Sequence, residues 1–106
     1  MSYRFMRVLV MFDLPTVTPE NRRDYRRFRK FLIRNGFVMM QESVYSRILL
    51  TTSAEQGVIS MLKRNKPPAG IVQVMSVTEK QFAKMECITG QYSSEVLNTD
   101  ERLVIL

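Results

Sequence analysis

Histidine is absent from this 106-residue chain, and cysteine occurs only once, as Cys87. Without histidine there can be no Ser–His or Cys–His catalytic pair, no histidine general base and no histidine metal ligand. A single thiol can form neither an intramolecular disulfide nor a cysteine zinc site. Any chemistry at this chain must therefore use carboxylates, hydroxyls, lysine or arginine, or a metal ion held by oxygen atoms.

Long apolar runs are also missing. The longest run near the N-terminus, residues 8–12, has five residues, whereas a membrane span needs about 20 and a signal-peptide core about 7–15. We therefore expect a cytoplasmic protein with no membrane partner. Apolar residues make up 45% of the chain and charged residues 25%, which is typical of a globular protein and predicts one domain over residues 1–106.

Acidic residues are few in one half of the chain. There are 16 basic residues against 10 acidic ones, which gives a net charge of +6. The whole excess lies in residues 1–53, whereas residues 54–106 carry equal numbers of both signs. Most of the basic residues are arginine, whose guanidinium group matches the oxygens of a phosphate. This distribution favours a polyanionic partner.

The predicted elements follow the order strand, helix, strand, strand, helix, strand. Thr18 can cap the first helix, Pro19 suits its first position, and Gly36 can end it in the left-handed conformation. Strands are predicted at residues 4–12, 37–41, 44–52 and 71–77, and helices at residues 19–35 and from the Ser53 region to the loop at residues 67–70. This order predicts an α+β fold, the ferredoxin-like βαββαβ arrangement, with a four-stranded antiparallel sheet and both helices on one face.

Two capping-box patterns and one turn refine these boundaries. Ser53 stands three residues before Gln56, and Thr78 stands three residues before Gln81, so each pair predicts the start of a helix. Glu42 and Ser43 separate two strands and predict the tight turn of a hairpin.

Residues 79–106 form an arm beyond the core unit of residues 1–78. A short helix is predicted after Thr78 and a polar loop over residues 89–100. The chain then ends in an apolar strand, which is an aggregation hazard unless something covers it. The strand could pair with the edge of its own sheet, but we favour a strand exchanged across a homodimer, with an interface formed by Leu103, Val104, Ile105 and Leu106.

A basic stripe dominates the first predicted helix. Its members occupy one arc of about 160° at roughly 100° per residue, and the aromatic residues fall on the opposite arc. Such a stripe is usually no more than a solvated face. Here, however, Asp24 is the only acid inside it, so i,i+4 pairs do not offset the like charges, and this favours a phosphate partner. The predicted nucleic-acid-binding residues are Arg22, Arg23, Arg26, Arg27, Arg29, Lys30 and Arg34.

Asp13 stands at the C-terminal end of the first predicted strand. Strand ends often meet ligands, and a carboxylate there can bind an oxygen-preferring divalent cation. An aspartate before a proline can also simply form a turn. One carboxylate is a poor Mg²⁺ site by itself, so a dimer that brings two together would strengthen the metal hypothesis. Glu42 and Ser43 are weaker candidates for additional metal or phosphate contacts.

Several segments in this order carry a family resemblance. They are Phe12-Asp13-Leu14-Pro15, the basic run of residues 21–32, and residues 36–37, 41–46 and 77–82. Together they resemble the small CRISPR-associated adaptation protein, CRISPR-associated protein two, the second subunit of the spacer integrase, in the branch that accompanies the Cas-nine effector. The resemblance covers essentially the whole chain. It implies a ferredoxin-like homodimer whose C-terminal strand pairs across subunits. It also implies a complex with the integrase subunit, CRISPR-associated protein one, in which the dimer holds the duplex DNA of a new spacer.

The resemblance also implies an alternative function. Some family members are described as Mg²⁺-dependent endonucleases that act on RNA or double-stranded DNA, and their strand-end aspartate, the catalytic residue and metal ligand, falls on Asp13. One Mg²⁺ could then be shared between the two Asp13 side chains of the dimer. Family members often carry tyrosine before this aspartate, whereas Phe12 here lacks the hydroxyl. A third hypothesis, an RNA-recognition module, requires a Gly-aromatic-x-aromatic motif on a central strand, which residues 44–49 lack.

Overall fold

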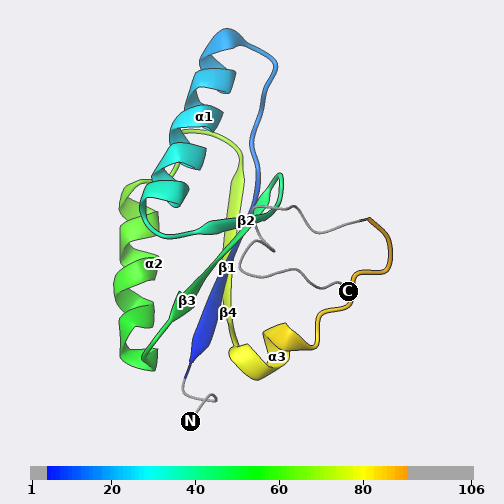
Figure 1. The fold of residues 1–106 in the computed structure, drawn as a ribbon. Coiled ribbons are helices and arrows are strands. Elements are labelled where there is room, and N and C mark those ends of the chain that lie inside the picture. Colours follow the sequence, from blue (N-terminus) through cyan, green and yellow to red (C-terminus); the bar gives the residue numbers. More distant parts are fainter. Residues whose placement is uncertain (1–4, 91–106) are drawn as a thin grey trace.

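A computed structural model describes residues 5–90 of the chain (Figure 1). In chain order the elements are β1 (Met6–Asp13), α1 (Pro19–Arg34), β2 (Val38–Gln41), β3 (Val44–Leu49), the 3-10 turn η2 (Thr52–Ala54), α2 (Glu55–Arg64), β4 (Ile71–Thr78) and α3 (Glu79–Ala83). The predicted α+β, ferredoxin-like order is confirmed. The predicted exchanged strand at residues 103–106 lies outside the described residues. Within residues 5–90, no helix has the length and hydropathy needed to cross a membrane.

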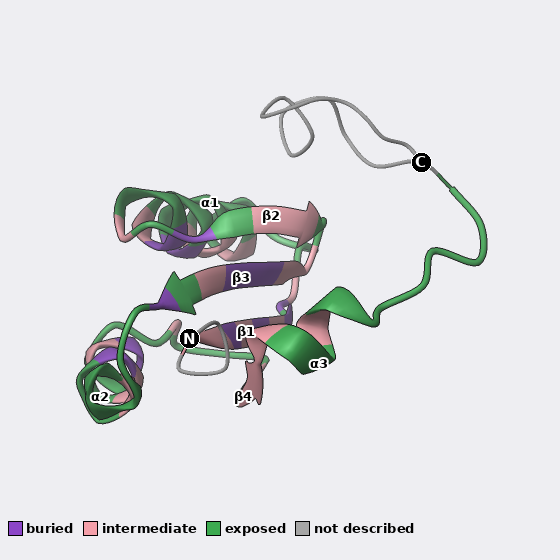
Figure 2. Cartoon of the chain, turned by 60° about the horizontal axis from the view of Figure 1, so that its bottom comes forward, coloured by how far each residue is buried: buried purple, intermediate pink, exposed green. Residues whose placement is uncertain are grey.

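The sheet is antiparallel and has the strand order β2-β3-β1-β4. β1 lies in its interior, where Val10 is opposite Tyr45 of β3 and Val74 of β4. Successive side chains of a strand point to opposite faces, so Val8, Val10 and Phe12 share one face. Both long helices cover that face, on the left of the sheet in Figure 1. The core, purple in Figure 2, consists of Val8, Val10, Phe12, Leu14, Phe28, Leu32, Phe37, Tyr45, Leu49, Val58 and Leu62.

The ends of α1 follow the local signals. Thr18 caps the helix: its Oγ1 accepts a hydrogen bond from the Asn21 amide at 2.9 Å, and the Asn21 side chain accepts one from the Thr18 amide at 3.2 Å. Gly36 follows the helix with a φ of 87°, a conformation that glycine adopts without steric cost. The sequence thus predicted both ends of the helix that carries the basic stripe.

The start of α2 was predicted incorrectly. Ser53 does not cap the helix, because Thr52–Ala54 forms the 3-10 turn η2 and α2 begins at Glu55 without a side-chain cap. The Ser53 hydroxyl instead lies 3.1 Å from the Thr51 hydroxyl. The extra 3-10 turn therefore moves Ser53 away from the position at which its hydroxyl could reach the first amides of α2.

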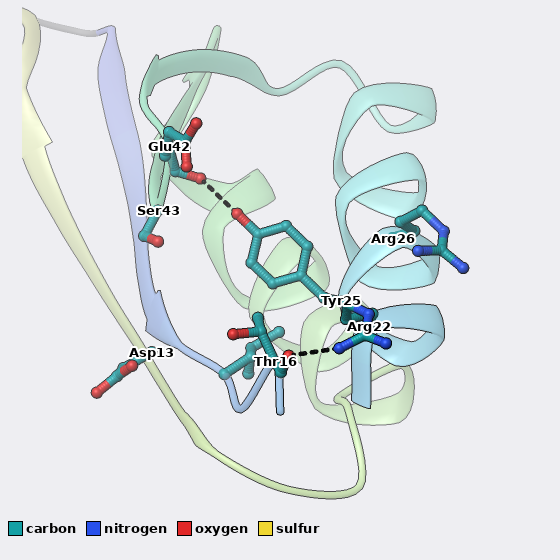
Figure 3. A pocket seen from close by; sticks show the side chains of 8 residues that line it. Asp13, Thr16, Arg22, Tyr25, Arg26, Glu42 and Ser43 are labelled. Atoms are coloured by element: carbon teal, nitrogen blue, oxygen red, sulfur yellow. Dashed lines mark hydrogen bonds between the residues drawn. The ribbon is translucent and has the colours of Figure 1, made fainter. Parts of the chain in front are cut away.

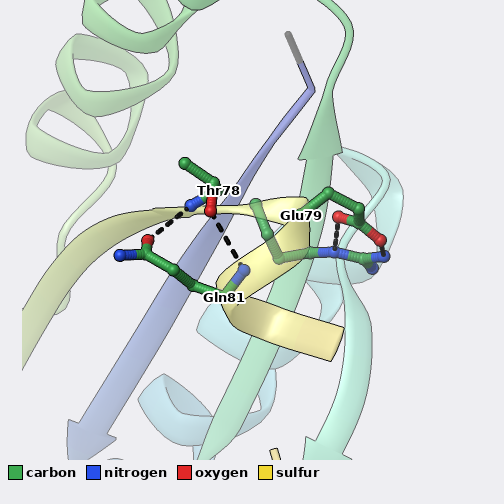
Figure 4. A network of polar contacts seen from close by, with 4 residues as sticks. Thr78, Glu79 and Gln81 are labelled. Carbon is green, nitrogen blue, oxygen red and sulfur yellow. Dashed lines mark hydrogen bonds and ion pairs between the residues drawn. The ribbon is translucent and has the colours of Figure 1, made fainter. Parts of the chain in front are cut away.

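A bidentate ion pair holds α3 against the opposite face of the sheet. Arg7 points to that face, and its guanidinium group donates to both carboxylate oxygens of Glu79, at 3.0 and 2.5 Å (Figure 4). The guanidinium carbon also lies 4.2 Å from the ring centre of Phe82. The predicted capping box is confirmed here, because Thr78 and Gln81 exchange hydrogen bonds of 3.0 and 2.9 Å. This cluster fixes the direction in which the chain leaves the sheet.

The two edges of the sheet differ. β2 has four residues, and its register with β3 is interrupted between Met39 and Gln41. β4 has eight residues and keeps a continuous register with β1 from Ile71 to Thr78. Within the described residues, β4 therefore offers the longer and more regular free edge.

Candidate nucleic-acid and metal site

Asp13 ends β1 as an exposed side chain. Strand alternation places it on the sheet face opposite Phe12, the face that α1 and α2 leave uncovered. Figure 3 shows its carboxylate directed away from α1 and from Tyr25. The strand thus delivers one solvated carboxylate to the rim of the sheet, as the sequence predicted.

A cavity of about 420 Å³ lies beside this strand end. Its walls are the loop after β1, the first turns of α1 and the β2–β3 turn, so Glu42 and Ser43 lie near the end of β1, although the Asp13 carboxylate points away from this cavity. The Tyr25 hydroxyl donates to the Glu42 carbonyl oxygen at 3.3 Å, and the Phe12 amide donates to the Ser43 carbonyl oxygen at 3.0 Å. These two bonds tie the turn to both neighbouring elements. The helical pattern places Tyr25 on the buried arc of α1 and does not show this contact. The hydroxyl group was the signal in the sequence, because a buried tyrosine usually needs a hydrogen-bond partner.

Arg22 is partly engaged within the chain. One of its terminal nitrogens, Nη1, donates to the carbonyl oxygens of Thr16 at 3.1 Å and of Val17 at 2.9 Å, which closes the loop between β1 and α1 (Figure 3). This side chain therefore fixes the loop that follows Asp13, in addition to its place at the edge of the predicted stripe.

The basic stripe is solvent-exposed along its whole length. All seven predicted residues are exposed, whereas Phe28 and Leu32 on the opposite arc are buried. Two members have acidic neighbours at i−3, a spacing that the i,i+4 argument left out: Arg23 lies 3.8 Å from Glu20, and Arg27 lies 3.8 Å from Asp24. Seven cations face these two acids and the paired arginine side chains stay largely exposed, so the surface remains strongly positive.

The candidate metal site has one carboxylate per chain. Among residues 5–90, no group of three or more histidine, cysteine, aspartate or glutamate side chains is placed to hold a metal ion. Mg²⁺ is usually held by one or two carboxylates together with waters and substrate phosphates. Asp13 could supply one such carboxylate, and because its side chain is exposed, a second ligand from another molecule could approach the ion.

Comparisons with known proteins agree on one family. The family model described as CRISPR associated protein Cas2 matches residues 6–85. A Treponema denticola protein named CRISPR-associated endoribonuclease Cas2 is 55% identical over 101 residues, which cover 95% of this chain and 100% of the relative. A protein of the same name from Streptococcus mutans serotype c is 50% identical over 101 residues, covering 95% and 93%. The crystal structure of Streptococcus pyogenes Cas2 at pH 6.5 has a similar fold, with a TM-score of 0.60 and 20% identity over 78% of this chain and 99% of that one.

Proposed function

Because the chain belongs to the Cas2 family of CRISPR-associated proteins, we propose that it is a CRISPR adaptation protein whose homodimer binds the duplex DNA of a new spacer. The observation that carries this proposal is the exposed stripe of seven basic side chains on α1. Regularly spaced cations on a rigid helix suit the phosphates of a duplex, which are contacted without regard to sequence. In this proposal the dimer acts in a complex with the integrase subunit, CRISPR-associated protein one.

The homodimer is supported by the sheet face opposite the two long helices. Four large apolar side chains of the strands are exposed, and the register places all of them on that face: Val38, Ile48, Ile71 and Met75. Clustered exposed apolar residues mark interaction surfaces in soluble proteins. Asp13 lies on the same face, so a two-fold contact through it would bring two Asp13 carboxylates into one interface.

The scaffold proposal is tested by the salt dependence of duplex binding. Each phosphate contact adds about 0.9 to the slope of log K against log salt. The triple variant of Arg23, Arg26 and Lys30 to glutamine should therefore lower the slope by up to about 2.7. The control removes three exposed charges elsewhere, at Lys63, Arg64 and Lys84. A control that lowers the slope more than the stripe variant would assign the duplex to another face.

A second candidate function is Mg²⁺-dependent endonuclease activity on RNA or double-stranded DNA. It is favoured by the exposed strand-end carboxylate of Asp13 and by the relatives, which are named endoribonucleases. Asp13 would hold the ion, with its partner-chain copy as a second ligand. When bound, the ion would supply positive charge at the phosphate and a more acidic water. The protein's own contribution is to place the carboxylate at the end of a buried strand.

Asp13→Asn separates the two functions. The variant keeps the shape of the side chain and removes the charge that binds the cation. We expect it to abolish chelator-sensitive cleavage while the dimer, its duplex affinity and integration with the partner subunit stay nearly unchanged. Cleavage that survives the substitution would assign the activity to another group. Loss of integration by an intact dimer would show that Asp13 serves the complex itself.

A further inference from the structure

A second cleft opens between α1 and the loop that joins α2 to β4. It has a volume of about 270 Å³ and is separate from the cavity beside Asp13. One wall comes from α1, from its second turn to its C-terminal end, and the other from residues 65–68, which come after α2 and run beside α1 in Figure 1. The volume lies just below the roughly 300–1,000 Å³ typical of pockets for drug-sized ligands. The cleft therefore has room for one small group.

The walls of this cleft combine aromatic and cationic side chains. Phe31 is partly exposed, and its ring stacks on the buried Phe28 with 6.2 Å between ring centres and 22° between planes, which fixes its orientation. Pro67 and Pro68 provide apolar surface on the opposite wall. Arg34 and Lys66 add exposed positive charges at the opening. An aromatic floor beside cations is the combination that binds an unpaired nucleotide, with the base stacked and the phosphate neutralised.

Asp24 is the one acidic residue among those that line the cleft, and it is much less exposed than the arginine beside it. Its side chain is only 20% exposed, whereas that of its neighbour Arg27 is 73% exposed, and the two lie 3.8 Å apart. Arg27 is thus free to turn toward a phosphate while the carboxylate stays in the cleft. An ionised carboxylate only accepts hydrogen bonds and offers two oxygens side by side. Guanine is the base that presents two adjacent N–H donors, N1–H and the N2 amino group, on its Watson–Crick edge.

We propose that this cleft binds a single unpaired guanine nucleotide, with the base against Phe31, its donor edge on Asp24 and its phosphate on Arg34 and Lys66. The proposal deepens the nucleic-acid binding proposed above and rests on it. Arg27 and Arg34 belong to the basic stripe, so a strand that leaves a duplex held on α1 reaches the cleft at the stripe's edge.

The test uses the full-length protein and three single strands of equal length. Each is a thymidine oligonucleotide whose central position carries thymine, guanine or hypoxanthine, which lacks the N2 amino group of guanine. We expect the guanine strand to bind about tenfold more tightly than the all-thymidine strand, within the range for one good bidentate pair, and the hypoxanthine strand to lie between them. Asp24→Asn should remove the preference for guanine. Equal affinity for all three strands, or a preference that survives Asp24→Asn, would overturn the proposal.

Two further variants separate stacking from general charge. Phe31→Leu keeps an apolar side chain but removes the aromatic ring. It should lower the affinity for the guanine strand about tenfold, near the low end of the stacking effect per base, and leave the affinity for a blunt duplex unchanged. An equal loss of affinity for the duplex and for the single strand would contradict the proposal that Phe31 stacks on a base. Arg23→Gln, an exposed charge on the same helix but outside the cleft, should leave the ratio of guanine to thymidine unchanged. The two proposals can fail separately. If the stripe variants leave duplex binding unchanged while the ratio of affinities for the guanine and thymidine strands still depends on Asp24, the scaffold proposal is wrong and the guanine site is supported.

Discussion

Gly70 meets the backbone of Asp13 so closely that a Cβ atom built on Gly70 would lie 2.7 Å from the Asp13 carbonyl oxygen. The same atom would lie 2.7 Å from Leu14 Cδ2, and Gly70 has a φ of +97°. The loop that leads into β4 can therefore close over the end of β1 only because this residue has no side chain. The position of the candidate carboxylate thus depends on a glycine 57 positions later in the sequence.

Gly70→Ala should lower the free energy of unfolding by about 2–4 kcal/mol, through left-handed strain and the clash together. Gly36→Ala is the matched control, because Gly36 also has a positive φ, but its nearest contact would be the flexible Arg47 side chain at 3.8 Å. The control should lose only about 1–2 kcal/mol from strain. Urea denaturation of both variants measures the difference. Equal losses would mean that the contact with Asp13 relaxes without cost.

The coupling between Arg7 and Glu79 should be measurable by a double-mutant cycle. The pair is bidentate, and its side chains are only 20% and 27% exposed, so we expect a coupling of about 1 kcal/mol. Arg23 and Glu20 give the control, since their side chains are 59% and 75% exposed at 3.8 Å. That coupling should be close to zero. Hydrogen exchange in α3 should also quicken in Glu79→Gln, and unchanged exchange would argue against the proposed anchoring of this helix.

Tyr45 should make stability depend on alkaline pH. Burial raises the pKa of its phenol above the ordinary value of 10.0, and the positive charge of Arg29 offsets only part of that rise. Above about pH 10 the unfolded chain loses this proton while the folded chain keeps it, so stability falls as the pH rises. Thermal melts of Tyr45→Phe should lack this part of the decline, and Tyr25→Phe should retain it. Identical pH profiles for both variants would rule out Tyr45 as its source.

Tyr45→Phe should also be tolerated at neutral pH. The Tyr45 hydroxyl is buried and forms no hydrogen bond of good geometry among the described residues, although the Arg29 side chain is close enough to lower its pKa. Removing an unsatisfied polar group recovers part of its desolvation cost, so we expect the melting temperature to stay equal or rise, by an amount that corresponds to at most about 1 kcal/mol. A clear loss of stability would show that the hydroxyl makes a favourable interaction in the folded protein, for which Arg29 is the neighbouring candidate.

Met75→Lys should weaken the proposed homodimer. Met75 is 49% exposed on the sheet face that also carries Ile48 and Ile71, and a charge there must be desolvated when two such faces meet. Val17→Lys is the control, since Val17 is 84% exposed in the loop before α1. Sedimentation should show at least tenfold weaker association for Met75→Lys alone. Deletion of residues 101–106 tests the exchanged strand in the same assay, and an unchanged dimer would contradict it.

Local chemistry made much of this fold predictable. Thr18, Pro19 and Gly36 defined the ends of α1 because capping and left-handed geometry depend on a few adjacent residues. The helical pattern did the same for the buried face of α1, which carries Phe28 and Leu32. The predicted cap at Ser53 was wrong because a 3-10 turn and a capping box use similar residues, and the local sequence does not determine which of the two forms.

The site was less predictable because its parts come from distant segments. Asp13 and the basic stripe could be found in the sequence, since each belongs to one element. The Tyr25 bond to Glu42 depends on the β2–β3 turn reaching α1, and the cleft lined by Asp24 and Lys66 depends on how the two helices pack. The Arg7–Glu79 pair follows from the register of β1 with β4, which brings together residues 72 positions apart. Such pairs require the tertiary structure.

The unequal edges of the sheet limit how the chain can assemble. A sheet with two equally usable edges can add copies of itself without end, as in fibrous aggregates. Here β4 offers eight residues in continuous register, whereas β2 offers four with an interruption. A strand supplied by a second copy would therefore join at β4, and two such additions related by a two-fold axis would use up both long edges. Growth would then stop at two chains, a closed assembly with no long edge left for polymerisation.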